Sequence, residues 1–270
     1  LPIDARAGDV FVGLDLEPRI VLAQRPFYRQ MRQRGVRVEF VVYDLLPILM
    51  PDRFMKGAEE LHAKWLGVVA ENDGALCISR SVADELCHWV ATDERAGRPS
   101  AGFAIGAFHL GVDALPEREK LESDWDAKLQ AAVASRPTFL MVGTIEPRKG
   151  YALVLDAFVR LWARNVDVNL VLAGREGWMV DALIKKLKAH PRLGKQLFWI
   201  ERADDAMLDR LYAAASCLVA ASEGEGFGLP LMEAAQRGLP VLARDIPVFR
   251  EVGGDGASYF EGDPDSLAVA

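Results

Sequence analysis

Two carboxylates, Glu225 and Glu233, offer the clearest chemistry in this sequence, and seven residues separate them. Three glycines alternate through the start of this stretch, at Gly224, Gly226 and Gly228. Glycine lets the backbone turn sharply and approach a ligand closely. Carboxylates accept hydrogen bonds from sugar hydroxyls, whereas they repel phosphate. The pair is therefore suited to a ligand that carries hydroxyl-bearing rings.

The elements on either side of these glycines predict an anion site. The apolar run 217–221 predicts a buried strand before the loop, and Pro230 and Gly238 predict the first turn and the end of a helix after it. Free N–H groups at a helix start bind phosphate. A nucleotide sugar, with phosphate between two rings, satisfies both the helix start and the carboxylates. In the structural alternative, Glu225 is a solvated loop residue and Glu233 is an acid that the helix dipole favours.

A cationic turn follows a second predicted strand. Residues 138–143 are typical of a buried strand, and the turn 143–150 carries Arg148 and Lys149. Arg binds phosphate through a two-pronged guanidinium and Lys acts as a point charge, so this turn is suited to hold a diphosphate. A solvated basic turn is the alternative.

These residues together resemble a known family. The segment 225–234 resembles the EX7E motif of the retaining GT-B glycosyltransferases of family 4, and the resemblance extends to 142–150 and 172–178. EX7E by itself is a loose signal, but the three motifs in this order are specific. The resemblance implies an α/β fold with two Rossmann-like parallel-sheet domains and a cleft between them, here truncated at one or both ends.

The resemblance also implies roles for individual residues. Glu225, Lys149 and Arg148 would be catalytic, because Glu225 would hold the transferred hexose and the two cations would neutralise the diphosphate. Glu233 would hold the ribose hydroxyls. The other donor-binding residues that it implies are Gly143, Thr144, Arg175, Gly226, Phe227, Gly228 and Leu229. We expect no metal ion, because protein cations do its work, and no cofactor beyond the nucleotide sugar as co-substrate.

The motifs look most like those of mannosyl- or rhamnosyl-transferring members that build bacterial surface polysaccharide such as O-antigen. The expected donor is GDP-mannose, with a UDP- or dTDP-sugar as the alternative, and the expected acceptor is a saccharide or a lipid-linked saccharide. Two other functions are considered, a non-catalytic nucleotide-sugar-binding fragment and an NAD-dependent nucleotide-sugar dehydrogenase or epimerase. The latter needs G-x-G-x-x-G after its first strand, and the glycines at 224–228 lie late in the chain with the wrong spacing.

The first half of the chain predicts a parallel-sheet domain of its own. Strand-like segments at 10–14 and 36–42 enclose a helix from about 18 to 35 that Gly35 ends, which is a β-α-β pattern. We assign the N-terminal, acceptor-side domain, the linker and the C-terminal nucleotide-sugar-binding domain to residues 1–114, 115–136 and 137–270.

Four residues of this first domain are candidates for the acceptor side, because each follows a predicted strand: Tyr43, Asp44, Ser79 and Arg80. The resembling family often has His where this chain has Tyr43, so the role of that position is open. Asp44 would also serve as a cap at the strand end. Ser81 is the predicted N-cap of the helix that follows Arg80.

An arginine-rich segment between residues 19 and 37 allows two interpretations. It would touch anionic lipid headgroups, with Phe27, Tyr28 and Met31 at the interface. The preferred interpretation is a helix of the parallel-sheet domain with a solvated basic face.

Composition limits the other functions. The net charge of −7 argues against a nucleic-acid partner, and three cysteines without CxxC and four histidines show no metal-ligand spacing. No apolar run is long enough to span a bilayer. We expect a cytoplasmic protein, with peripheral contact at the inner face of the cytoplasmic membrane as a further possibility. The chain begins without Met or a signal peptide, so we expect it to be part of a longer protein.

Overall fold

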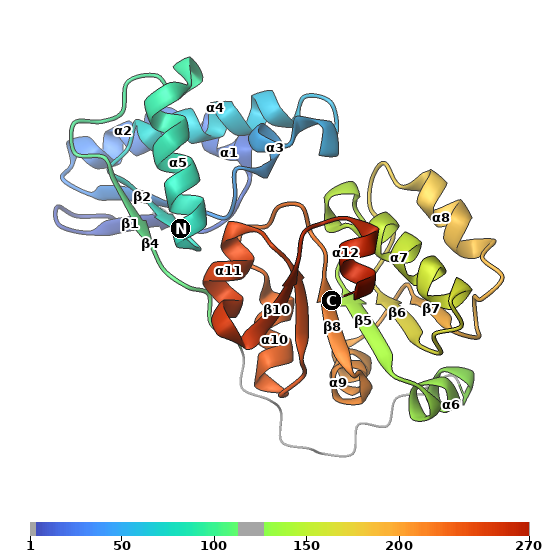
Figure 1. Cartoon of the computed structure of the whole chain (residues 1–270). Coiled ribbons are helices and arrows are strands. Elements are labelled where there is room, and N and C mark those ends of the chain that lie inside the picture. Colours follow the sequence, from blue (N-terminus) through green and yellow to red (C-terminus); the bar gives the residue numbers. More distant parts are fainter. Residues whose placement is uncertain (1–3, 113–126, 270) are drawn as a thin grey trace. The chain divides into compact units, whose positions relative to one another are not determined.

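The computed structural model describes residues 4–112 and 127–269. It divides the chain into two compact units, one of residues 1–110 and 225–227, the other of residues 111–224 and 228–270. Each unit has its own parallel sheet with helices packed on it (Figure 1). The predicted fold class, two parallel-sheet α/β domains, is confirmed.

The first sheet has four parallel strands in the order β1-β2-β3-β4. They are β1 (Val10–Gly13), β2 (Arg37–Val42), β3 (Gly74–Cys77) and β4 (Ala104–Ala107). The helices of this unit are α1 (Pro18–Ala23), α2 (Arg25–Gln33), α3 (Leu46–Leu49), α4 (Ala58–Ala70) and α5 (Arg80–Thr92), with short 3₁₀ turns η1 (Pro51–Arg53) and η2 (Glu94–Ala96). The apolar residues of β2 and β3 form one core with α2, α4 and α5.

The predicted helix 18–35 is two helices, α1 and α2, which meet at Gln24. Gly35 follows the C-cap of α2 with a φ of +80°, as expected for the glycine that ends a helix. Tyr28 and Met31 are buried in the core of this unit, where they pack with β2. The alternative in which Phe27, Tyr28 and Met31 meet lipid is therefore wrong, because this apolar face of α2 packs against the sheet and Phe27 is itself partly buried there. The basic face lies at the surface, as in the preferred interpretation.

The second sheet has six parallel strands in the order β10-β9-β8-β5-β6-β7. They are β5 (Thr138–Val142), β6 (Asn169–Ala173), β7 (Leu197–Ile200), β8 (Cys217–Ala220), β9 (Val241–Arg244) and β10 (Ala257–Phe260). The chain runs outward from β5 in one direction through β6 and β7, and in the other through β8, β9 and β10. The order therefore reverses between β5 and β8, and ligands of such sheets bind at the carboxyl ends of the strands at this switch point.

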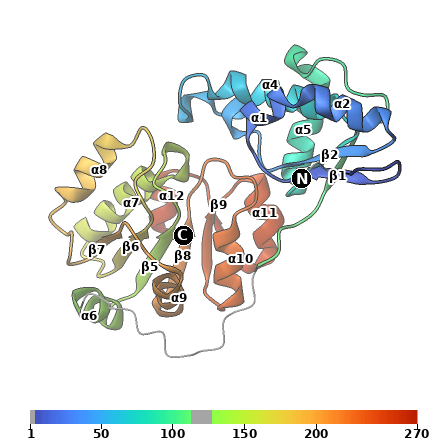
Figure 2. The ribbon, with the colours of Figure 1, turned by 180° about the vertical axis from the view of Figure 1, so that it is seen from behind.

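Helices cover both faces of this sheet (Figures 1 and 2). Because side chains alternate along a strand, Met141 and Val219 face one core, and Leu140 and Leu218 face the other. The first core contains α7 (Tyr151–Ala163), α8 (Asp181–Lys188) and α12 (Pro264–Val269). The second contains α6 (Ala127–Ser135), α9 (Asp205–Ala214), α10 (Leu229–Gln236) and α11 (Pro247–Gly253).

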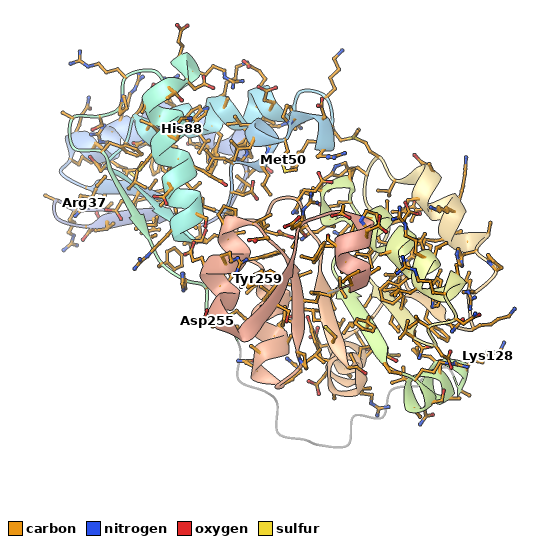
Figure 3. The ribbon with its side chains drawn as sticks, in the orientation of Figure 1. Arg37, Met50, His88, Lys128, Asp255 and Tyr259 are labelled. Carbon is orange, nitrogen blue, oxygen red and sulfur yellow. The ribbon has the colours of Figure 1, made fainter. Side chains whose placement is uncertain are left out.

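The predicted linker 115–136 includes α6, whose Leu129 and Ala132 are buried against the sheet. Residues 115–126 of this linker lie outside the described residues. The domain boundaries themselves stay a prediction. Strand β10 and helix α11 were not predicted. The Tyr259 phenol on β10 donates to the carbonyls of Phe249 (3.1 Å) and Gly254 (2.8 Å), which joins β10 to α11 and the turn η4 (Gly254–Gly256) (Figure 3).

Among the described residues, no helix combines the length and apolar character that crossing a bilayer requires.

Candidate donor site

The donor-side motifs meet at the switch point of the second sheet. β5 and β8 are neighbours, with Phe139 opposite Cys217 and Leu140 opposite Leu218. The cationic turn follows β5 and the glycine-rich loop follows β8. Because the strands are parallel, both segments leave the sheet at the same edge.

The cationic turn η3 (Pro147–Lys149) is bonded directly to the glycine-rich loop. The N–H of Glu223 donates to the carbonyl of Arg148 (2.7 Å), and the guanidinium Nη1 of Arg148 donates to the carbonyl of Gly224 (3.0 Å). Gly150 has a φ of +74°, and a Cβ there would lie 2.2 Å from the carbonyl oxygen of Ala221, so only glycine fits this contact. The turn and the loop that leads into α10 are therefore neighbours, as the diphosphate prediction requires.

Arg148 is braced within this contact. Its Nε lies 3.2 Å from a carboxylate oxygen of Glu146, and the two side chains are only 13% and 9% exposed. Glu146 was not a predicted site residue. The guanidinium thus bonds protein groups on two sides, and a diphosphate role for Arg148 stays a prediction. The adjacent Lys149 is half-buried, and its N–H donates to the carbonyl of Glu146 (3.1 Å).

The loop after β5 is also joined to the loop after β6. The N–H of Ile145 donates to the carbonyl of Arg175 (2.9 Å), and the N–H of Gly177 donates to the carbonyl of Ile145 (3.0 Å). A Cβ at Gly174 would lie 1.8 Å from the carbonyl oxygen of Gly143, so glycine is required at that crossing. Gly143, Thr144 and Arg175 therefore lie on two adjoining loops at this sheet edge, with the Arg175 side chain exposed.

Helix α10 begins at the end of the glycine-rich loop. Its N-cap is Gly228, whose φ of +100° is favourable only for glycine, and Pro230 lies in its first turn as predicted. Gly226 and Phe227 immediately precede this cap in the chain. Leu229, the first helical residue, is 40% exposed. Gly238 follows the C-cap with a φ of +64°, which confirms the predicted end of the helix.

Glu233 is held by a residue that was not predicted. The phenol of Tyr212, on α9, donates to Oε2 of Glu233. Burial, and then the neighbouring Glu233 carboxylate, raise the pKa of the Tyr212 phenol, so it stays protonated as a donor. The Arg237 guanidinium lies 4.9 Å from the Tyr212 ring centroid and 2.8 Å from Asp209. This cluster fixes the orientation of the Glu233 carboxylate, while its ribose role, like the hexose role of Glu225, stays a prediction.

The four acceptor-side candidates lie at the carboxyl edge of the first sheet, where Val42 of β2 is opposite Cys77 of β3. The Tyr43 phenol donates to the carbonyl of Leu14 (2.7 Å). Asp44 accepts from the N–H of Leu46 (3.0 Å), but the N-cap of α3 is Leu45 and not Asp44. Ser79, and not Ser81, is the N-cap of α5, because its hydroxyl accepts from the N–H of Val82 (3.1 Å). Arg80 is the first residue of that helix, and its side chain is exposed.

Two buried titratable groups beside Asp44 were not predicted. His62 lies with Nε2 2.9 Å from the carbonyl of Asp44, and burial lowers its pKa. Burial, and then the Asp44 carboxylate, raise the pKa of Glu85 to about 7. Both come from helices, α4 and α5, and no local pattern marks them as neighbours of a strand end. Within residues 4–112 and 127–269, no three His, Cys, Asp or Glu side chains form a group that would hold a metal ion. The expectation that the site needs no metal ion stays a prediction.

With this geometry established, comparison with known proteins defines the class. The family model for glycosyl transferases group 1 matches residues 125–269, which is more than half of the chain. The chain belongs to this family.

Several relatives are mannosyltransferases. The chain is 41% identical to the serotype-specific mannosyltransferase WbdA of Escherichia coli, over all of this chain and 33% of that protein. It is 37% identical to the O-antigen chain mannosyltransferase B of Escherichia coli, over 53% of this chain and 35% of that one. The chain thus spans about a third of the length of WbdA, and the part of it that matches mannosyltransferase B spans about a third of that protein.

Solved structures share the fold at low identity. Anabaena Alr3699/HepE in complex with UDP and glucose superposes with a TM-score of 0.68 at 18% identity, over 96% of this chain and 66% of that one. An α,α-trehalose-phosphate synthase from Burkholderia xenovorans gives a TM-score of 0.70 at 16% identity, over 97% of this chain and 64% of that one. These structures support the GT-B fold class.

Proposed function

We propose that this chain is the catalytic part of a retaining, family 4 glycosyltransferase. It transfers a hexose, with mannose as the first candidate, from a nucleotide diphosphate sugar to a saccharide or lipid-linked saccharide acceptor. GDP-mannose is the preferred donor, and a UDP- or dTDP-sugar is the alternative. The observation that carries the proposal is the bonding of the Arg148 turn to the loop before α10 at the switch point. The mannosyltransferase names of the relatives support the choice of sugar.

The proposed chemistry is electrostatic. When the glycosidic bond of the donor breaks, negative charge grows on the leaving diphosphate. Lys149 and the positive end of α10 face that charge from two neighbouring loops and stabilise it. Arg148 contributes its charge at the same edge and holds the two loops together. Glu233, oriented by Tyr212, binds the ribose hydroxyls.

In the same proposal Glu225 binds hydroxyls of the transferred hexose, and the acceptor hydroxyl attacks from the face that the nucleotide leaves. The acceptor is a saccharide of the polysaccharide that such enzymes build, as the O-antigen mannosyltransferase relatives suggest. A cytoplasmic location, where nucleotide sugars are made, and contact with the inner face of the cytoplasmic membrane belong to the proposal as well.

The first test is a thermal-shift screen of the chain against GDP, UDP, dTDP and ADP sugars, followed by an assay of nucleotide release. We expect GDP-mannose to raise the melting temperature most and to release GDP when a mannosyl acceptor is added. Release of GDP without transfer of the sugar to the acceptor, or formation of NADH from NAD, would contradict the proposal. Binding without turnover would identify the chain as a nucleotide-sugar-binding fragment.

Two variants separate the roles in the donor site. Lys149→Ala should weaken GDP binding at least about tenfold, as expected for a lost charge-assisted hydrogen bond, and leave guanosine binding nearly unchanged. Lys195→Ala, an exposed lysine of the same unit, is the matched control. Glu225→Gln should abolish transfer and change GDP affinity less than about twofold. Equal weakening of GDP and guanosine by Lys149→Ala would remove the argument for a diphosphate site.

A further inference from the structure

A second cationic site lies on the first unit, at the opposite edge of its sheet from the acceptor-side candidates. Three arginines of α2, Arg25, Arg29 and Arg32, follow one another at helical spacing and face a pocket of about 240 Å³. The pocket is also lined by Glu71 and Asn72, which precede β3, and by Arg98 and Ser100, which precede β4. These residues stand at the amino ends of the strands, so the pocket has no part in the chemistry described above.

The two most buried of these arginines are used by the fold. Arg32 donates to Asp73 (3.0 Å), to the carbonyl of Glu71 (2.6 Å) and to the hydroxyl of Ser100 (2.8 Å). Arg25 donates through Nε to Glu71 (2.6 Å). These bonds fix α2 against the start of β3, and they explain why the two acids are present.

The bonds do not account for Arg29 and Arg98. Arg29 is 65% exposed and reaches Glu71 only at 3.7 Å. Arg98 is exposed and makes no hydrogen bond or ion pair with the described part of the chain. Four arginines face one glutamate in the pocket, and even with Asp73 counted the site carries a surplus of two positive charges. A positive surplus held together on a chain with a net charge of −7 is a local arrangement, not a property of the whole surface.

We propose that this pocket binds a phosphate-bearing anion. Arg29 and Arg98 contact the phosphate oxygens, and Arg25 and Arg32, already ordered by their acids, form the rigid wall of the site. Guanidinium groups bind phosphate through paired N–H donors. A phosphate therefore matches this cluster of arginines better than an apolar ligand does. The phosphate belongs either to a free diphosphate or to the headgroup of an anionic lipid, and the test distinguishes these sources.

The test uses the 270-residue chain with isotopically labelled arginine, titrated with inorganic pyrophosphate and followed by NMR of the guanidinium Nε–H groups. Signals that vanish in Arg29→Ala and Arg98→Ala identify the two residues. We expect pyrophosphate to shift both signals, and each variant to weaken this binding about three- to tenfold. Arg34→Ala, which removes an exposed arginine next to the pocket that does not line it, is the control and should change affinity less than twofold.

A reciprocal variant tests the charge argument. Glu71→Gln removes the acid from the pocket and should strengthen pyrophosphate binding severalfold, whereas Lys149→Ala should leave these arginine signals unshifted even though it acts on the donor site. Flotation with phosphatidylglycerol and phosphatidylcholine vesicles then shows whether the bound phosphate belongs to a lipid headgroup or to a free diphosphate. Capture by phosphatidylglycerol that Arg29→Ala and Arg98→Ala reduce supports a lipid headgroup, and pyrophosphate binding without capture supports a free diphosphate. The proposal is overturned if Arg29→Ala and Arg98→Ala lose no more pyrophosphate affinity than Arg34→Ala does, or if pyrophosphate shifts neither guanidinium signal.

Discussion

Replacing Arg148 with Ala tests whether this residue mainly binds the diphosphate or mainly holds the two loops of the donor site together. The sequence motif assigns Arg148 and Lys149 together to the diphosphate. In the structure the Arg148 guanidinium is 13% exposed, pairs with Glu146 and donates to the carbonyl of Gly224. We therefore expect Arg148→Ala to lower the stability of the protein, and Lys149→Ala to lower nucleotide affinity.

The expected loss follows from burial. Removing one partner of a fully buried ion pair costs about 3–5 kcal/mol, because the other charge is left in a poor environment. Glu146 and Arg148 keep roughly a tenth of their exposure, so we take the low end, about 3 kcal/mol. For a chain of this size about 2–4 °C of melting temperature corresponds to each kcal/mol, which gives a fall of about 6–12 °C.

The assay is thermal unfolding of the ligand-free chain, with Arg164→Ala as control. Arg164 is an exposed arginine at the end of α7, so its loss changes the net charge equally and should change the melting temperature by less than about 2 °C. The double variant with Glu146→Gln should recover part of the loss. A melting temperature unchanged in Arg148→Ala, together with a loss of GDP affinity as large as that of Lys149→Ala, would refute the bracing role.

Three other variants test separate features. Tyr212→Phe should weaken binding of GDP about fivefold by isothermal calorimetry, with little change in stability, since one net hydrogen bond of about 1 kcal/mol orients the Glu233 carboxylate that we propose binds ribose; an unchanged affinity would contradict it. Gly174→Ala should prevent stable folding, because its Cβ would overlap a backbone oxygen, whereas Gly256→Ala, in open space, should melt near the wild type. Burial and a neighbouring carboxylate raise the pKa of Glu85 from 4.5 to about 7 in the folded protein. The folded state therefore loses stability as pH rises through this range, because the unfolded state gives up the proton more easily. Glu85→Gln should therefore have a free energy of unfolding roughly 1–3 kcal/mol above that of wild type at pH 8, after allowance for partial exposure, but not at pH 4.5, and the exposed Asp84→Asn should show no such gain.

The sequence predicted the donor half well because its signals are local. Pro230 and Gly238 mark the start and the end of α10 through their backbone conformations, as predicted. Runs such as 138–143 are apolar on both faces, which only a strand covered by helices on two sides allows. The cationic turn lies near the glycine-rich loop because β5 and β8 are neighbours, and this strand order was not predicted from the sequence.

Interactions between distant elements were not predictable in this way. Tyr212 and Glu233 lie on two helices that only the finished packing brings together, and nothing in the local pattern of either helix marks the pair. Glu146 stands two residues from Arg148 inside the motif, yet a partner at that spacing is visible only when the turn is known to be a 3₁₀ turn. Strand β10 was also missed, because its Ala-Ser-Tyr-Phe sequence at the edge of the sheet is not the apolar run that predicts a buried strand.

The carboxyl edges of the two sheets differ in how many of their polar side chains hydrogen-bond to the protein's own backbone. At the edge of the first sheet, Tyr43, Asp44 and Ser79 each bond to backbone groups within a few residues or on the adjacent loop, and so hold the strand ends in place. At the switch point of the second sheet, the loops are held mainly by backbone hydrogen bonds and close glycine contacts, to which the Arg148 side chain adds a hydrogen bond to the Gly224 carbonyl. A site whose loops are fixed by their own backbone tolerates changes of side chain without losing its shape. The sequence motifs therefore predict a donor site in this chain, whereas no comparable motif predicts how the acceptor is bound.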